Sequence, residues 1–204
     1  MREKIKKLTY NIEDNFFLTV IRNGLTLLIP LILVGGISCA LMNLPFPNYT
    51  TAFSQGKLSW LYQLFEAVYQ GTFGIFSIAL VITLSMSFGM ERNETMDKTV
   101  MYVIVALGSF GAQLNFGSAQ FDADSLGTKG SFSAMVIALF ACFCYSRLKE
   151  IAGLSLKRYT IGMEGMCANA IQTFLPAALI IGMVALFNQI IIAAFGVSNL
   201  HQLF

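Results

Sequence analysis

A stretch of twenty residues without a charged side chain, 25–44, limits what this chain can fold into more than any other feature. At a rise of about 1.5 Å per residue, a helix of that length crosses the roughly 30 Å hydrocarbon core of a bilayer. Its polar members are Thr26, Ser38 and Asn43, and they form no polar face of the kind that a core helix of a soluble protein shows. The stretch predicts a membrane-spanning helix.

The composition extends this prediction to the whole chain. Hydrophobic residues make up 56% and charged residues 12% of the sequence, and the mean hydropathy is +0.68. Soluble domains carry about 25% charged residues. The net charge of +2 is small and its basic residues are dispersed, which argues against nucleic acid as a partner. We expect an all-α integral membrane protein that has the lipid bilayer as its surroundings.

Further apolar runs give about five predicted transmembrane helices. A short segment, 1–15, precedes the membrane domain, 16–204. In this segment Ile5, Leu8 and Ile12 recur at helical spacing, which predicts a short amphipathic helix on the membrane surface. The predicted spans are 25–44, 72–90, 99–116, 131–146 and 171–195.

Lysine and arginine are distributed unevenly over the predicted loops. The loops on the side of the N-terminus hold most of them, whereas the loops on the other side hold only Lys57 and Lys129. The positive-inside rule therefore places the N-terminus in the cytoplasm. The aromatic side chains from Phe53 to Tyr69 are then expected in an outer loop, at the membrane–water interface. The basic residues of the cytoplasmic side are Arg2, Lys4, Lys6, Lys7, Arg92, Lys98, Arg147, Lys149, Lys157 and Arg158.

The first span and its surroundings contain candidate structural and interface residues. Arg22 can either extend its guanidinium to the headgroups or face a protein interior and pair there. Pro30 removes a helical hydrogen bond and favours a kink, and Gly35 and Gly36 allow another helix to approach closely. Glu164, at the margin of the fifth span, is either an ordinary interface charge or a functional carboxylate. The full candidate set is Arg22, Gly24, Pro30, Gly35, Gly36 and Glu164.

No catalytic constellation is visible in the sequence. His201 is the single histidine, and no serine or cysteine nucleophile has a base near it. Cys142 and Cys144 are too closely spaced for a usual metal pair, and the four cysteines are expected to be small packing residues. Asp122 and Asp124 lack the further ligands of a calcium loop and are expected in a solvated loop. We expect no metal site and no cofactor.

Several motifs resemble the first membrane segment of the lactose/cellobiose-type EIIC permeases of the bacterial phosphotransferase system. These motifs are Ile21-Arg22-Asn23-Gly24-Leu25, Ile29-Pro30-Leu31-Ile32, Val34-Gly35-Gly36 and Asn43-Leu44-Pro45. Gly162-Met-Glu-Gly165, before a fifth span that contains Thr173-Phe174-Leu175-Pro176, is similar too. The resemblance covers nearly all of this chain but only about the first half of such a permease. We therefore expect the chain to be incomplete at its C-terminus.

The resemblance implies phosphoenolpyruvate-dependent uptake of a sugar, a disaccharide in this family, through the bacterial inner membrane. It implies a cytoplasmic EIIB-type partner that carries phosphohistidine, and a homodimer. In the family the first five spans form the scaffold and the dimer interface, and the sugar site lies in the later half. No catalytic residue is therefore carried over, and whether this chain takes part in an enzymatic step stays open.

An alternative rests on Leu44-Pro45-Phe46-Pro47-Asn48-Tyr49. This stretch is similar to one in proteins that join an EIIC-like membrane domain to a cyclic-dinucleotide phosphodiesterase, which implies a sensory membrane input module. A plain dimerisation scaffold is a third hypothesis. A permease predicts a second membrane half downstream, whereas a sensor predicts a long soluble domain.

Overall fold

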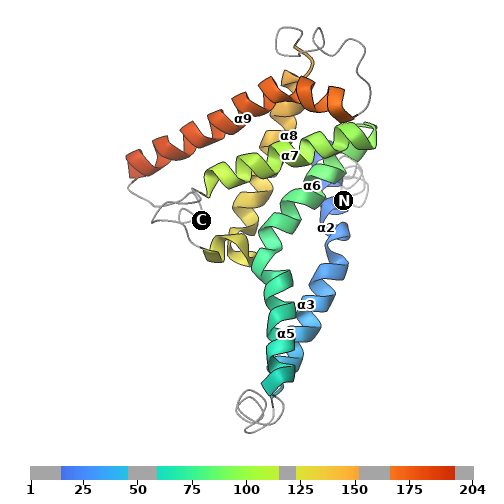
Figure 1. The fold of residues 1–204 in the computed structure, drawn as a ribbon, viewed down its shortest axis with the longest axis vertical. Helices are drawn as coiled ribbons and strands as arrows, with labels where there is room; N and C mark the ends of the chain where they lie inside the picture. Colours follow the sequence, from blue (N-terminus) through green and yellow to red (C-terminus); the bar gives the residue numbers. More distant parts are fainter. Residues whose placement is uncertain (1–14, 46–58, 115–122, 152–165, 196–204) are drawn as a thin grey trace, which may run out of the picture.

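The computed structural model describes residues 15–45, 59–114, 123–151 and 166–195, and their regular structure is helical throughout (Figure 1). The predicted all-α fold is confirmed. The N-terminal amphipathic helix falls in 1–14, outside the described residues. The helices are α2 (Phe16–Leu27), α3 (Ile29–Met42), α5 (Ser59–Thr72), α6 (Phe76–Glu91), α7 (Met96–Gln113), α8 (Ser131–Leu148) and α9 (Met166–Phe195), with 3-10 turns η1 (Phe73–Ile75), η2 (Ala123–Leu126) and η3 (Thr128–Gly130).

Three segments of the described chain are long and apolar enough to cross a membrane: Ser59–Glu91, Thr128–Leu148 and Cys167–Ile190. The bent pair of α2 and α3 would make a fourth. The chain is therefore a multi-pass membrane protein. Helix α7, which contains most of the predicted span 99–116, is not among these candidates. It begins in the charged turn, and its glycine, serine and glutamine residues dilute its hydrophobicity. Figure 1 shows α7 and α9 running side by side, and α7 also packs against α6 and α8.

The first predicted span, 25–44, begins in the last residues of α2 and continues through α3, and these two helices meet at an angle of 47°. The backbone N–H of Leu28, at the junction, bonds to the carbonyl oxygen of Leu25 at 3.1 Å. Pro30 lies in the first turn of α3. A proline there sacrifices no helical hydrogen bond, because the first N–H groups of a helix have no partner within it. The kink expected from Pro30 is present, as a break immediately before it.

The second predicted span, 72–90, is only the later part of a longer one. Helix α5, turn η1 and helix α6 form a segment of 33 residues. The expectation that the aromatic stretch lies in an outer loop is therefore wrong for residues 59–69, since Trp60 and Tyr69 lie on helix α5. Helices α3 and α5 pack side by side and project as an arm from the other helices (Figure 1). The helix forms because α3 gives the apolar residues of α5 a surface on which to pack.

The core of the molecule surrounds α6, which packs against α2, α7 and α8. Leu84 and Phe88 of α6, Val20 of α2 and Tyr102 of α7 are all fully buried there. The hydroxyl of Ser87 donates to the backbone oxygen of Val20 at 3.0 Å and ties α6 to α2. Serine hydroxyls are common contacts of this kind between membrane helices, where water does not compete for them.

The end of α7 is held by a side chain from α9. The Nδ2 of Asn188 donates to the backbone oxygen of Gln113 at 2.8 Å, and both residues are fully buried. The last carbonyls of a helix have no partner within it, so the amide of Asn188 satisfies one of them. This contact supports the extensive packing of α7 on α9.

Two neighbouring glycines of α3 provide a test of the α3–α5 contact. A Cβ at Gly35 would lie 2.8 Å and 2.9 Å from ring carbons of Phe73 and would also meet the Thr72 hydroxyl, whereas a Cβ at Gly36 would meet nothing within 4 Å. Gly35→Ala should destabilise the protein by about 1–3 kcal/mol through overpacking. Gly36→Ala should be neutral, or stabilising by up to about 1 kcal/mol, because alanine favours helix. Thermal unfolding in detergent measures both, and equal melting temperatures would contradict the close approach at Gly35.

Candidate functional site

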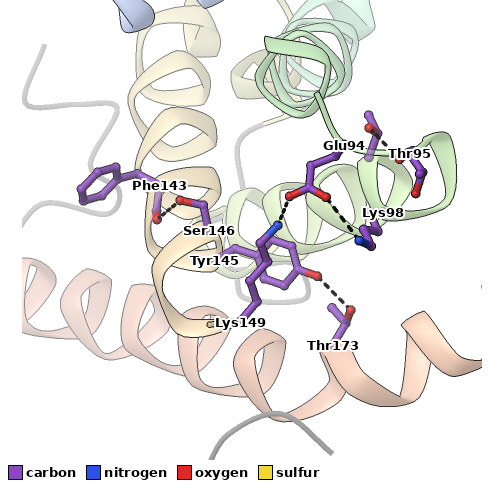
Figure 2. Close-up of polar contacts among 9 residues, drawn as sticks. Glu94, Thr95, Lys98, Phe143, Tyr145, Ser146, Lys149 and Thr173 are labelled. Carbon is purple, nitrogen blue, oxygen red and sulfur yellow. Dashed lines mark hydrogen bonds and ion pairs between the residues drawn. The ribbon is translucent and has the colours of Figure 1, made fainter. Parts of the chain in front are cut away.

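Polar side chains gather where the α6–α7 turn, the end of α8 and the first half of α9 meet (Figure 2). Glu94 comes from the turn, Lys98 from the first turns of α7, and Tyr145 and Lys149 from the end of α8. Thr173 comes from α9. We call these five residues the lysine–glutamate cluster.

The turn after α6 positions Glu94. Asn93 has φ 54°, in the left-handed region that asparagine tolerates better than most residues, and this reverses the chain. The backbone N–H of Glu94 then bonds to the carbonyl oxygen of Gly89 at 3.2 Å. Gly89 itself lies against Thr99 of α7, where a Cβ would come within 2.7 Å of the threonine methyl group. The turn is therefore fixed by a backbone hydrogen bond and by close packing of Gly89 on α7. The Glu94 carboxylate faces α8.

Lys149 is the main partner of Glu94, with which it forms an ion pair and hydrogen bond. Their side chains are 24% and 18% exposed, whereas Lys98, at 3.7 Å from the same carboxylate, is 52% exposed. The Lys149 ammonium also lies 5.0 Å from the ring centroid of Tyr102. Because solvent screens an exposed pair more than a half-buried one, Lys149 contributes more than Lys98.

Opposing effects act on the pKa of Glu94. Partial burial raises the pKa, but the Lys149 hydrogen bond and charge, together with the weaker contribution of Lys98, lower it, and the net pKa lies below its ordinary value of 4.5. The carboxylate is therefore ionised at neutral pH.

A second contact joins α8 to α9. The hydroxyl oxygens of Tyr145 and Thr173 are 3.0 Å apart, and Thr173 also donates to the backbone oxygen of Asn169 at 2.7 Å. A threonine hydroxyl has one proton, so Tyr145 must be the donor to Thr173. The Tyr145 ring meets the Tyr102 ring edge to face, with centroids 4.7 Å apart. The cluster thus connects α7, α8 and α9 with the turn after α6.

A cavity of about 270 Å³ opens at the cluster. Its charged lining residues are Glu94, Lys98, Lys149 and Glu150, whose formal charges cancel. Within the described residues the lining offers no nucleophile with a base beside it. The arrangement can position helices and bind a small polar group.

The candidate residues predicted from the sequence lie elsewhere, on α2 and α3. Arg22 is exposed on α2, so neither of its two interpretations is decided. Gly24 is buried, and a Cβ there would lie 2.7 Å from a methyl carbon of Leu84. Gly35 is buried against η1 and the end of α5, Gly36 is half-buried and Pro30 is exposed. Glu164 lies outside the described residues, as does His201.

The sequence did not predict the lysine–glutamate cluster, because Glu94 and Lys149 lie in different loops, 55 residues apart. The available signal was their opposite charge on the same predicted side of the membrane. Among the described residues, no group of three or more histidine, cysteine or acidic side chains could hold a metal ion.

The comparisons with known proteins decide the family. Residues 22–202 match the sequence model of the phosphotransferase system EIIC family. The chain belongs to the EIIC family. It is 26% identical over 197 residues to the oligo-beta-mannoside-specific EIIC component of Bacillus subtilis (strain 168), a match that covers 94% of this chain and 43% of the relative.

The fold supports this EIIC membership. The chain is similar to the crystal structure of the transporter ChbC, the IIC component from the N,N'-diacetylchitobiose-specific phosphotransferase system, with a TM-score of 0.80 and 17% sequence identity. The match covers 98% of this chain and 48% of ChbC. The chain therefore spans less than half the length of either relative. The resemblance first noted in the motifs around Arg22 and Pro30 is confirmed at the level of the family.

The ion pair of Glu94 with Lys149 predicts a pH dependence of stability. The pKa of the Glu94 carboxyl is lowered from 4.5 in the folded state. The contribution of the ionised carboxylate to stability is therefore complete above pH 4.5 and is lost as the pH falls through the folded-state pKa. The wild-type protein should therefore lose stability below about pH 4.5, and Glu94→Gln should lose less over the same range. Melting temperatures in detergent between neutral and acidic pH measure this difference.

Two lysine variants serve as matched controls for this profile. Lys149→Met removes the main cause of the lowered pKa and should flatten the profile as Glu94→Gln does. Lys98→Met removes the exposed partner and should keep most of the wild-type slope. A Glu94→Gln profile that is parallel to wild type would rule out the pair as the source of acid sensitivity.

Proposed function

We propose that this chain forms the membrane scaffold half of an EIIC permease and takes part in phosphoenolpyruvate-dependent sugar uptake. The observation that carries the proposal is the EIIC match over residues 22–202, joined to a fold similarity over 98% of the chain. The chain covers 43% and 48% of its two EIIC relatives. The described residues form packed helices, which fits a scaffold half.

We propose a disaccharide as the sugar. Support comes from the names of the two relatives, which are specific for oligo-beta-mannoside and for N,N'-diacetylchitobiose. Both are assembled from more than one sugar unit. Because both relatives are EIIC components, the comparisons favour a permease over the sensory module of a phosphodiesterase.

A cytoplasmic EIIB-type subunit that carries phosphohistidine is the proposed protein partner, and the bacterial inner membrane is the proposed location. The arrangement of charges supports this orientation. Arg92 and Lys98 follow α6 closely, and Arg147 and Lys149 end α8, so the ion pairs with Glu94 bring these basic segments to one end of the bundle. Lys129 lies at the opposite end of α8. One strongly basic end fits a cytoplasmic face.

A test of the permease function begins with the DNA that follows the codon for Phe204. We expect an open frame that continues into further apolar spans containing a histidine and a glutamate within the membrane. The product of that frame should take up a radiolabelled disaccharide only in cells that contain the cognate EIIB subunit. Continuation into a soluble signalling domain, or uptake that does not require EIIB, would refute the proposal.

A homodimer of the chain is a further part of the proposal. The outer face of α3 is apolar and open, with Leu33 58% and Ile37 60% exposed. Apolar faces of this kind can be covered by lipid or by a second protein copy. We expect native mass spectrometry of the chain, released from detergent, to show a dimer, and Ile37→Glu to shift it towards monomer. Gln63→Glu, which changes an exposed residue of α5, is the control. A monomeric wild type would contradict the dimer.

A further inference from the structure

A second cavity, of about 500 Å³, lies at the break between α5 and α6. It is distinct from the lysine–glutamate cluster. Tyr69, Gln70 and Phe73 form one side, and Asp124 and Lys129 form the other. Pockets that hold small organic ligands are usually about 300–1,000 Å³, with apolar walls and a few polar groups. We call this cavity the η1 pocket.

The η1 pocket is held open by well-anchored backbone. A short 3-10 turn, η1, interrupts the long helical segment at this point, and such turns often mark a hinge or local strain. The hydroxyl of Ser77 donates to the backbone oxygen of Gly127 at 2.6 Å, which ties the segment of η2 and η3 to the first turn of α6. A Cβ at Gly127 would lie 3.0 Å from the backbone oxygen of Phe73, so glycine permits this close approach. The two walls are therefore fixed relative to each other.

The aromatic wall offers ring surface for an apolar ligand face. The rings of Tyr69 and Phe73 have centroids 5.5 Å apart and are tilted by 53° to each other. Both residues are half-buried, so part of their surface stays open. Tyrosine adds a hydroxyl to its apolar ring, and the exposed amide of Gln70 can both donate and accept hydrogen bonds.

The opposite wall carries charges that cancel. Lys129 forms an ion pair with Asp124, and both side chains are 62% exposed. The hydrogen bond and charge of Lys129 hold the pKa of the Asp124 carboxyl below its ordinary value, so the pair is ionised at neutral pH. An ionic ligand would have to compete with the pair, whereas hydroxyl groups can donate to the carboxylate and accept from the ammonium at once.

These features match the chemistry of a sugar ring, which has apolar C–H faces and hydroxyl groups around its edge. The pocket also lies at the end of α8 opposite the lysine–glutamate cluster, since Lys129 precedes α8 and Lys149 follows it. The positive-inside orientation places that end outside the cell. A sugar would arrive from this side.

We propose that the η1 pocket is an outward-facing collecting site that binds a neutral sugar before it reaches the transport site. The proposal rests on the proposed permease function and extends it to a sugar site within this half. Tyr69 and Phe73 stack on the sugar ring. Gln70, Asp124 and Lys129 hydrogen-bond its hydroxyl groups.

Binding of sugar to the purified full chain in detergent tests the proposal directly. Isothermal titration calorimetry with cellobiose, mannobiose and N,N'-diacetylchitobiose should show saturable binding of at least one of them to the wild-type chain. Asp124→Asn should raise its Kd by about tenfold, because the neutral amide replaces a carboxylate that accepts charge-assisted hydrogen bonds from sugar hydroxyl groups. Gln70→Ala, at an exposed position, should raise the Kd while the melting temperature stays unchanged.

Matched controls separate the pocket from general effects. Glu66→Gln removes an exposed carboxylate from the same helix but outside the pocket lining, and Phe140→Leu removes an exposed ring from α8. Both should bind like wild type. Absence of sugar binding by the wild-type chain would overturn the proposal. A wild-type Kd in both Asp124→Asn and Gln70→Ala would overturn it too. A pocket that binds a lipid headgroup, and not sugar, would give the first of these results.

The two proposals fail in different experiments. If the chain binds no sugar but the full reading frame still shows EIIB-dependent uptake, the permease function holds and the η1 pocket is not a sugar site. If the chain binds sugar and uptake does not require EIIB, the permease function fails while the pocket assignment stands.

Discussion

A hydrocarbon layer offers no hydrogen-bond partner to a backbone amide or carbonyl, so every break in a membrane helix needs a local solution. At the break between α2 and α3, Pro30 has no N–H to satisfy and the N–H of Leu28 turns back to Leu25. At the end of α5, the Thr72 hydroxyl lies within hydrogen-bond distance of the Val68 and Tyr69 carbonyl oxygens, at 2.8 Å and 3.0 Å. At the end of α7, the side-chain amide of Asn188 donates to the Gln113 carbonyl. Polar residues in this apolar chain thus gather where helices stop.

The two ends of α8 differ in chemistry for a related reason. Charged side chains can lie only where the membrane ends, so ion pairs form at helix termini and between segments on the same side. Glu94 pairs with Lys149 at one end, and Asp124 pairs with Lys129 at the other. The first pair is half-buried among aromatic rings and connects several helices. The second is exposed and forms one wall of the η1 pocket. The first therefore suits a structural role, and the second is accessible to a ligand.

Membership of the EIIC family gives these features a common setting. The described helices form the part of a transporter fold that ChbC shares over 48% of its length. In this setting the lysine–glutamate cluster secures the end proposed to face the EIIB partner, and the η1 pocket lies at the end proposed to meet the sugar. The apolar surfaces of α3 and α9 between these ends are open, with Ile37 60% and Leu186 67% exposed. Lipid or protein can cover them, which is the condition expected of a scaffold.

Hydrophobicity along the sequence was enough to predict an all-α membrane protein, the positions of most helices, the kink at Pro30 and, with the motifs around Arg22, the family. These properties depend on local composition and backbone chemistry, which the sequence contains directly. Composition could not show that Trp60 and Tyr69 belong to a helix, because that helix forms on the surface of α3. Nor could it bring Glu94 to Lys149, 55 residues apart, or Tyr69 to Asp124 across the η1 pocket. Only the tertiary structure decides such contacts, since they arise when helices distant in sequence pack together and bring their polar ends into reach.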